Sequence, residues 1–129
     1  MSKIKLDELQ LAIMQVLWEK GEATVAEIQD ALKDSRDLAI TTIGTVLSRL
    51  EEKKGAVTHI TQGRKYVYKP AISEQETKTS MVGSLVKQLF KGRSVSLVNH
   101  LIEKDELDQE ELDQLKKMIE KAEEKNRNN

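Results

Sequence analysis

The 129-residue chain has no cysteine, one proline, six glycines and few aromatic residues, namely one Trp, two Tyr and one Phe. Without thiols it forms no disulfide, no thiolate metal site and no cysteine nucleophile. The scarcity of proline and glycine argues against β-sandwiches, collagen-like repeats and long flexible linkers. No apolar run approaches the ~18 residues that cross a bilayer, and no charged-then-apolar leader follows Met1. We therefore expect a cytoplasmic protein without membrane insertion.

The charges are nearly balanced overall but are unevenly distributed. Lys and Arg number 21 against 22 Asp and Glu, a net charge of -1, which counts against a protein that is basic throughout. Residues 41–70, however, hold six Lys or Arg and only two Glu. An anionic partner is therefore expected to bind this part of the chain.

Apolar spacing predicts three helices in the first fifty residues. The first covers residues 7–20 and has one apolar face. Thr24 and Glu27 have the spacing of a capping box and begin the second helix. The polar residues 34–37 favour local side-chain hydrogen bonds and separate the second helix from a third, which begins near Ile40.

The outer face of the third helix differs from an ordinary solvated face, which carries Glu and Lys. Its apolar residues Ile43, Leu47 and Leu50 face inward and leave Thr, Ser and Gly side chains on the other side. Such residues are short and form helices weakly, so they are favoured where another surface approaches closely.

Period-two alternation over residues 56–70 predicts a β-hairpin. Gly63 supplies the turn, Pro70 stops the second strand, and Arg64 and Lys65 lie at or beside the tip. Three helices followed by a basic hairpin are typical of a winged helix-turn-helix domain, which we place at residues 1–72.

In such a domain the third helix enters the major groove of DNA and the wing grips the backbone. Arg49 has two alternatives, because it can bind a phosphate or pair with Glu52 on the helix surface. The expected DNA-binding residues are Ile40, Thr41, Thr42, Gly44, Thr45, Ser48, Arg49, Arg64 and Lys65.

The apolar spacing of residues 73–129 predicts three amphipathic helices that have no obvious core of their own. The tail from Glu123 is expected to fray. Segments of this kind bury their apolar surface against a second copy, so we expect a homodimer. The expected dimerisation residues are Val82, Leu85, Leu89, Phe90, Leu97, Leu101, Leu112, Leu115 and Ile119. The fold class is thus mainly α with a small hairpin, a winged helix followed by a three-helix dimerisation region.

Three blocks, in order along the chain, resemble the penicillinase-repressor family, whose relatives include BlaI, MecI and CopY. They are the Leu-Ala-Ile-Met-Gln-Val-Leu-Trp helix at 11–18, the Thr-Thr-Ile-x-Thr-x-Leu-x-Arg-Leu block at 41–50 and the Gly-Arg-x-Tyr-x-Tyr-x-Pro wing at 63–70. The resemblance implies a homodimeric bacterial repressor that binds a dyad-symmetric DNA operator, often including its own promoter. Relatives control β-lactam resistance or copper homeostasis.

The sequence departs from this family in several places. Gly44 stands where relatives often place a longer groove residue, and residues 51–55 are one residue longer than usual. The absence of cysteine excludes the copper sensing of relatives that carry a C-terminal cysteine cluster. Antibiotic-responsive relatives are cut by a membrane sensor protease at an Asn-Phe bond. The matching segment, with Asn99, His100 and Leu101, lacks that bond and is only a candidate cleavage region.

Two other classes of function are alternatives to DNA binding, a protein-interaction module and an enzyme. A winged helix that binds only a protein partner is compatible with the near-zero net charge, but would carry apolar or aromatic residues outside the third helix. An enzyme would need a nucleophile and base, a glycine-rich phosphate loop or a metal set. The chain has none of these patterns, and His59 and His100 are its only histidines, so no catalytic residue, metal or cofactor is expected.

Overall fold

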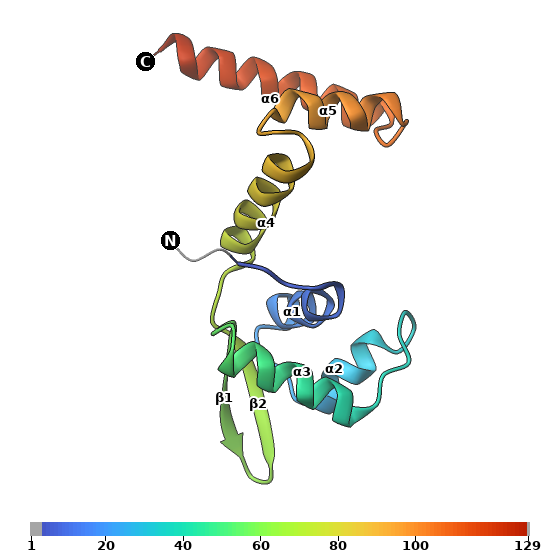
Figure 1. Cartoon of the computed structure of the whole chain (residues 1–129), viewed down its shortest axis with the longest axis vertical. Helices are drawn as coiled ribbons and strands as arrows, with labels where there is room; N and C mark the ends of the chain where they lie inside the picture. Colours follow the sequence, from blue (N-terminus) through green and yellow to red (C-terminus); the bar gives the residue numbers. More distant parts are fainter. Residues whose placement is uncertain (1–3, 129) are drawn as a thin grey trace. The chain divides into compact units, whose positions relative to one another are not determined.

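The computed structural model describes residues 4–128, which form six helices and one antiparallel hairpin (Figure 1). The elements are α1 (Glu8–Lys20), α2 (Val25–Leu32), α3 (Ile40–Glu52), β1 (Val57–Gln62), β2 (Lys65–Pro70), α4 (Glu74–Leu89), α5 (Ser94–Glu103) and α6 (Gln109–Arg127). The predicted fold class is confirmed. Contacts divide the chain into two compact units, one ending at Gly83 and one beginning at Ser84, so α4 contributes to both.

Local sequence signals set the helix ends of the first unit. The Gln10 amide donates to Asp7 Oδ1 (2.7 Å) while the Asp7 amide donates to Gln10 Oε1 (3.0 Å), a capping box at the start of α1. Thr24 and Glu27 form the same reciprocal pair at the start of α2. Gly21 ends α1 at a φ of 85°, which glycine adopts without a steric penalty.

The core of the first unit lies where α1, α2, α3 and the hairpin meet. Ile13, Met14, Leu17, Ile28 and the inward residues of α3 are fully buried. Met14 lies to the side of the main apolar stripe of α1 and is still fully buried, because α1 is covered by α2, α3 and β2. Burying each such side chain contributes roughly 1.5–3 kcal/mol to the free energy of unfolding. The packing of α1 in this core therefore helps to hold α3 in place.

The hairpin pairs in register from Val57 opposite Pro70 to Gln62 opposite Lys65, which leaves Gly63 and Arg64 as a two-residue turn. Gly63 has a φ of 65°, as turns of this length require. A further bridge joins Ala23, between α1 and α2, to Tyr68 through two backbone hydrogen bonds of 3.0 and 2.8 Å. The base of the wing is therefore tied to the helical body.

The first half of α4 belongs to the first unit. The Trp18 indole N–H donates to the Ile72 carbonyl (2.9 Å), and the Ile4 amide donates to Ser80 Oγ (3.0 Å). Thr77 is buried, and its hydroxyl donates to the Ser73 carbonyl (2.8 Å). These contacts fix the chain as it leaves β2 and enters α4.

The second unit contains the end of α4 together with α5 and α6. Asp108 and Glu111 form a capping box that begins α6, which continues to Arg127 although fraying was expected from Glu123. No residue of α5 or α6 is buried. Their apolar side chains are at least partly open to solvent in the single chain. None of the helices within residues 4–128 is long and apolar enough to cross a membrane.

Candidate nucleic-acid interface

The loop between α2 and α3 is held by side-chain contacts that fix the start of α3. Gln29 Nε2 donates to the Leu38 carbonyl (2.8 Å), so α2 holds the last turn of the loop. Arg36 pairs with Glu8 of α1 at 2.7 Å. The helix-turn-helix is therefore a fixed unit, and α3 begins at Ile40 after an extended Ala39.

The predicted recognition residues gather on the outer face of α3. Thr41, Thr42, Thr45, Ser48 and Arg49 are exposed, while Ile43, Leu47 and Leu50 on the opposite face are fully buried. Ile40 is exposed and Gly44 is half-buried on the same outer side. A shallow hollow of about 340 Å³ on this face is lined by Thr41, Thr42, Thr45, Val46 and Arg49.

The start of α3 has the features of an anion-binding helix end. Its cap residue, Ala39, offers no side-chain hydrogen bond, and its first turn contains no acid. The first amide groups of a helix have no intrahelical acceptor, and the helix dipole places partial positive charge there. A phosphate oxygen next to Ile40 or Thr41 would satisfy these amides.

The threonines of this face are not equivalent. The Thr45 hydroxyl donates to the Thr41 carbonyl one turn earlier (2.9 Å), so its proton is already engaged. Thr45 can therefore present a lone pair and a methyl group to a partner. Thr41 and Thr42 are exposed at the first turn, where a hydroxyl lies beside the helix amides.

The basic side chains divide into engaged and unengaged groups. Within residues 4–128 no carboxylate lies at ion-pair distance from Arg49, so the alternative pairing with Glu52 is not formed. In the same range Arg64 and Lys65 on the wing are exposed and without ion pairs. Lys54 instead donates to the Lys5 carbonyl (2.5 Å). Arg49 and the wing tip are therefore available to an anion.

An unpredicted cluster of rings joins α3 to the wing. His59 Nδ1 lies 2.7 and 3.0 Å from the two carboxylate oxygens of Glu51 in the last turn of α3. The His59 ring stacks on Tyr66 with centroids 4.3 Å apart and lies 5.5 Å from Tyr68. Burial, followed by the nearby charges of Glu51 and Tyr66, raises the pKa of the Tyr68 phenol. The sequence pattern indicates that Tyr66 and Tyr68 share one strand face and pack on the third helix, but it does not predict that Glu51 holds the His59 ring.

The predicted dimerisation residues are all at least partly exposed in the single chain. Leu89 is 67 % exposed and Ile119 57 %, high values for large apolar side chains. Val82 and Leu85 are also exposed, and the others are half-buried: Phe90, Leu97, Leu101, Leu112 and Leu115.

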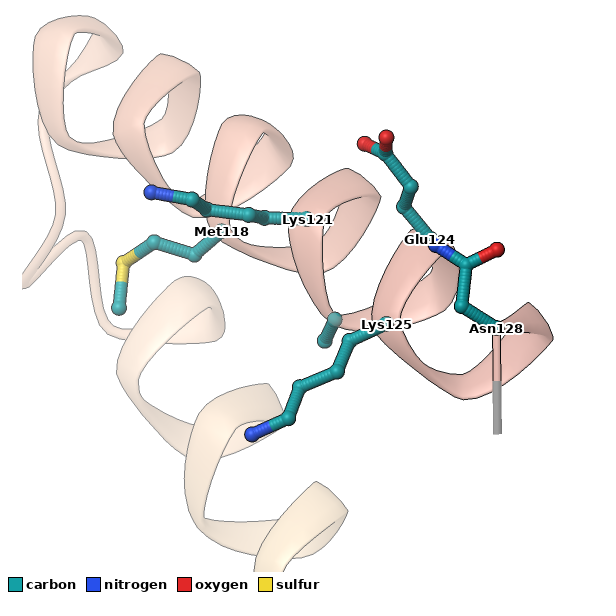
Figure 2. A pocket seen from close by; sticks show the side chains of 6 residues that line it. Met118, Lys121, Glu124, Lys125 and Asn128 are labelled. Carbon is teal, nitrogen blue, oxygen red and sulfur yellow. The ribbon is translucent and has the colours of Figure 1, made fainter.

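A shallow hollow of about 700 Å³ lies along the second half of α6. Figure 2 shows Met118, Lys121 and Lys125 extending to one side of this helix, with Glu124 on the other. The hollow is lined by residues of one helix only and is largely open, so it is part of an uncovered helix face and not an enclosed ligand pocket.

The candidate cleavage region lies inside α5. Asn99, His100 and Leu101 are helical; the Asn99 amide donates to the Glu103 carboxylate (3.4 Å), and the His100 ring packs edge-on against Phe90. A protease that acts on extended chain would have to unwind this helix first. In residues 4–128 no three His, Cys, Asp or Glu side chains are placed to hold a metal ion.

The family model described as penicillinase repressor matches residues 6–121, which include α3, the wing and most of α6. The chain belongs to the penicillinase repressor family. Because this family is made up of transcriptional repressors, the chain is a transcriptional repressor and not an enzyme.

Individual members of the penicillinase repressor family are similar over most of the chain. The penicillinase repressor of Bacillus licheniformis is 33 % identical over 128 residues, which are 98 % of each chain. The transcriptional regulator BlaI of Mycobacterium tuberculosis is 35 % identical over 102 residues, 78 % of this chain and 73 % of its own. The solution structure of the DNA-binding domain of the repressor BlaI matches 59 % of this chain and 93 % of that domain, with 35 % identity and a TM-score of 0.50.

Proposed function

We propose that this repressor binds a dyad-symmetric DNA operator as a homodimer, with residues 1–72 contacting DNA and residues 73–129 forming the dimer. The observation that carries the proposal is the outer face of α3. The side chains of this face are exposed, mostly short and polar, and the helix begins without a side-chain cap. The wing lies in the same unit, and its Arg64 and Lys65 form no ion pair with any of residues 4–128. The solved BlaI domain that resembles this unit is a DNA-binding domain.

In this proposal α3 lies in the major groove. Thr41 and Thr42 donate to phosphate or to base edges at the helix start, and Thr45 offers its lone pair and methyl group to a base. Arg49 and the wing residues Arg64 and Lys65 contact phosphates, which positions the domain without reading sequence.

The exposed apolar residues of α4, α5 and α6 are the proposed dimer interface. Two winged domains related by a two-fold axis would read half-sites about 10 bp apart, or a multiple of this distance. Each domain raises the effective concentration of the other on the operator, so the dimer binds far more tightly than one domain. A dimer on a promoter in the cytoplasm would block polymerase sterically.

Derepression is proposed to act on the second unit. Cutting or unwinding α5 near Asn99, His100 and Leu101 would remove part of the dimer interface and with it the avidity. A membrane sensor protease is the proposed agent, by similarity to antibiotic-responsive relatives, and β-lactam resistance or a related stress response is the proposed regulon, together with the repressor's own gene.

A fluorescence-anisotropy titration against the DNA upstream of its own gene tests the operator proposal. Scrambled DNA of equal length is the control, and both are measured at several salt concentrations. We expect tight binding to the upstream DNA only, with a log–log salt slope of roughly -4 to -8 for about 5 to 9 phosphates. Weak and equal binding to both DNAs, together with a dimer in sedimentation, would instead favour a protein-interaction module.

A further inference from the structure

We propose that Glu51 and His59 are positioning residues that aim the wing at the DNA backbone. Glu51 fixes the His59 ring, and that ring stacks on Tyr66 and holds the outer half of the hairpin. The direction of the turn that carries Arg64 is thereby set from α3. This inference rests on the proposed DNA-binding function and deepens it.

The contact joins two elements that must act together on DNA. Glu51 is in the last turn of α3, and both of its carboxylate oxygens lie within 3.0 Å of His59 Nδ1. The His59 and Tyr66 rings are inclined by only 25° at 4.3 Å, an offset-stacked geometry that restricts rotation of both side chains. The Glu51 and His59 side chains are each about one-third exposed, so either can be substituted without disturbing the core.

Apart from the ring stack, the outer half of the hairpin has one buried side chain, Val67 of β2, which is 5 % exposed. A two-stranded ribbon is marginally stable alone and bends readily. Val57 and Tyr68 at its base are buried, but Ile60 and Tyr66 further out are each 50 % exposed. Among the described residues, the ring stack is the aromatic contact that leads from this outer half back to α3.

A small tilt of the hairpin at the ring stack produces a large displacement of its tip. About four residues of strand, at ~3.3 Å each, separate the stack from the end of the turn. A tilt of about 15° there would move the tip by roughly 3 Å, the length of one hydrogen bond. Phosphate contacts from the wing would then be lost or replaced by water.

The positioning role and simple electrostatics predict opposite changes in DNA affinity when Glu51 is substituted. Glu51 is an acid near a DNA-binding surface, so removing its charge alone should strengthen binding to phosphates. Loss of the contact to His59 should weaken binding, because the wing cations miss their phosphates. Glu52 is the matched control, since it is the next residue, is exposed and makes no hydrogen bond or ion pair within residues 4–128.

The experiment compares Glu51→Ala with Glu52→Ala in the full-length protein, by anisotropy on upstream and scrambled DNA across a salt series. Alanine removes the acceptor for His59 Nδ1 as well as the charge, whereas glutamine would keep an oxygen that can accept from it. We expect Glu52→Ala to bind as well as the wild type or slightly better. We expect Glu51→Ala to bind roughly fivefold more weakly than Glu52→Ala, with a salt slope less steep by about 2, one phosphate for each wing of the dimer. Loss of fold alone would lower the active fraction and the melting temperature but would leave the slope unchanged.

A double-mutant cycle with Arg64→Ala tests whether the effect passes through the wing. In the Arg64→Ala background, Glu51→Ala should cost almost nothing further, because the contact that it positions is already gone. Equal affinities and slopes for Glu51→Ala and Glu52→Ala would overturn the positioning role while leaving the repressor proposal standing. A wild type that does not distinguish upstream from scrambled DNA would overturn the operator proposal, and the slopes on scrambled DNA would still decide whether Glu51 acts on the wing.

Discussion

Gly44→Ala should stabilise the fold and weaken DNA binding at the same time. Gly44 lies in the middle of α3 with helical backbone, and an added Cβ has no heavy atom outside its own helix within 4 Å. Alanine in place of glycine at such a position contributes about 1 kcal/mol to the free energy of unfolding. For a unit of this size we expect the melting temperature to rise by about 5 °C.

The effect on DNA depends on the face that Gly44 occupies. Thr41, Gly44, Thr45 and Ser48 have the i, i+3, i+4, i+7 spacing of one helix face, so Gly44 is at its centre. If this face lies against the groove, an added methyl group separates the surfaces and costs roughly 1–3 kcal/mol, which lowers the affinity by about fivefold to 150-fold.

The assay pairs thermal unfolding with anisotropy on the upstream DNA. Gly83→Ala is the matched control, because Gly83 is helical and equally open but lies in α4. We expect it to raise the melting temperature without changing DNA affinity. Unchanged operator affinity for Gly44→Ala, alongside the rise in melting temperature, would refute the placement of this face in the groove.

Three further predictions follow from the same structure. Arg64→Ala should weaken binding to every sequence and make the salt slope less steep, whereas Thr45→Val should change the preferred sequence; equal losses on operator and random DNA for both would contradict this division. Because burial raises the Tyr68 pKa, its neutral phenol stabilises the fold fully below pH 10.0, and this contribution is lost as pH rises through the folded pKa. Urea unfolding from pH 8 to 11.5 should therefore show a loss of stability that Tyr68→Phe reduces. Leu89→Glu should give a monomer in sedimentation whose first unit stays folded, and an intact dimer would exclude this residue from the interface.

Local chemistry explains most of what could be predicted from the sequence. Capping boxes such as that of Thr24 and Glu27 act within four residues. A turn glycine such as Gly63 is needed because one position of the turn has a positive φ. These signals placed the start of α2 and the turn of the wing without any knowledge of packing.

Contacts between distant residues could not be predicted in this way. The bridge between Ala23 and Tyr68 depends on where the chain passes the sheet after α1 ends. The hydrogen bond from the Trp18 indole to the Ile72 carbonyl joins residues 54 positions apart. The Glu51–His59 pair depends on the angle at which α3 meets β1. Such angles are set by the packing of the whole core. They cannot be predicted from the pattern of apolar and polar residues along the chain.

The distribution of burial bears on how repression can be reversed. The first unit keeps its core and its hydrogen-bonded helix-turn-helix within one chain, so it can stay folded whatever happens to the rest. In α5 and α6 no residue is buried in the single chain, so in the proposed homodimer their ordering would depend on the surface that the second copy supplies. Folding of the second unit and dimerisation are then one equilibrium. Damage to α5 would leave two intact DNA-binding domains but remove the avidity that holds them on the operator.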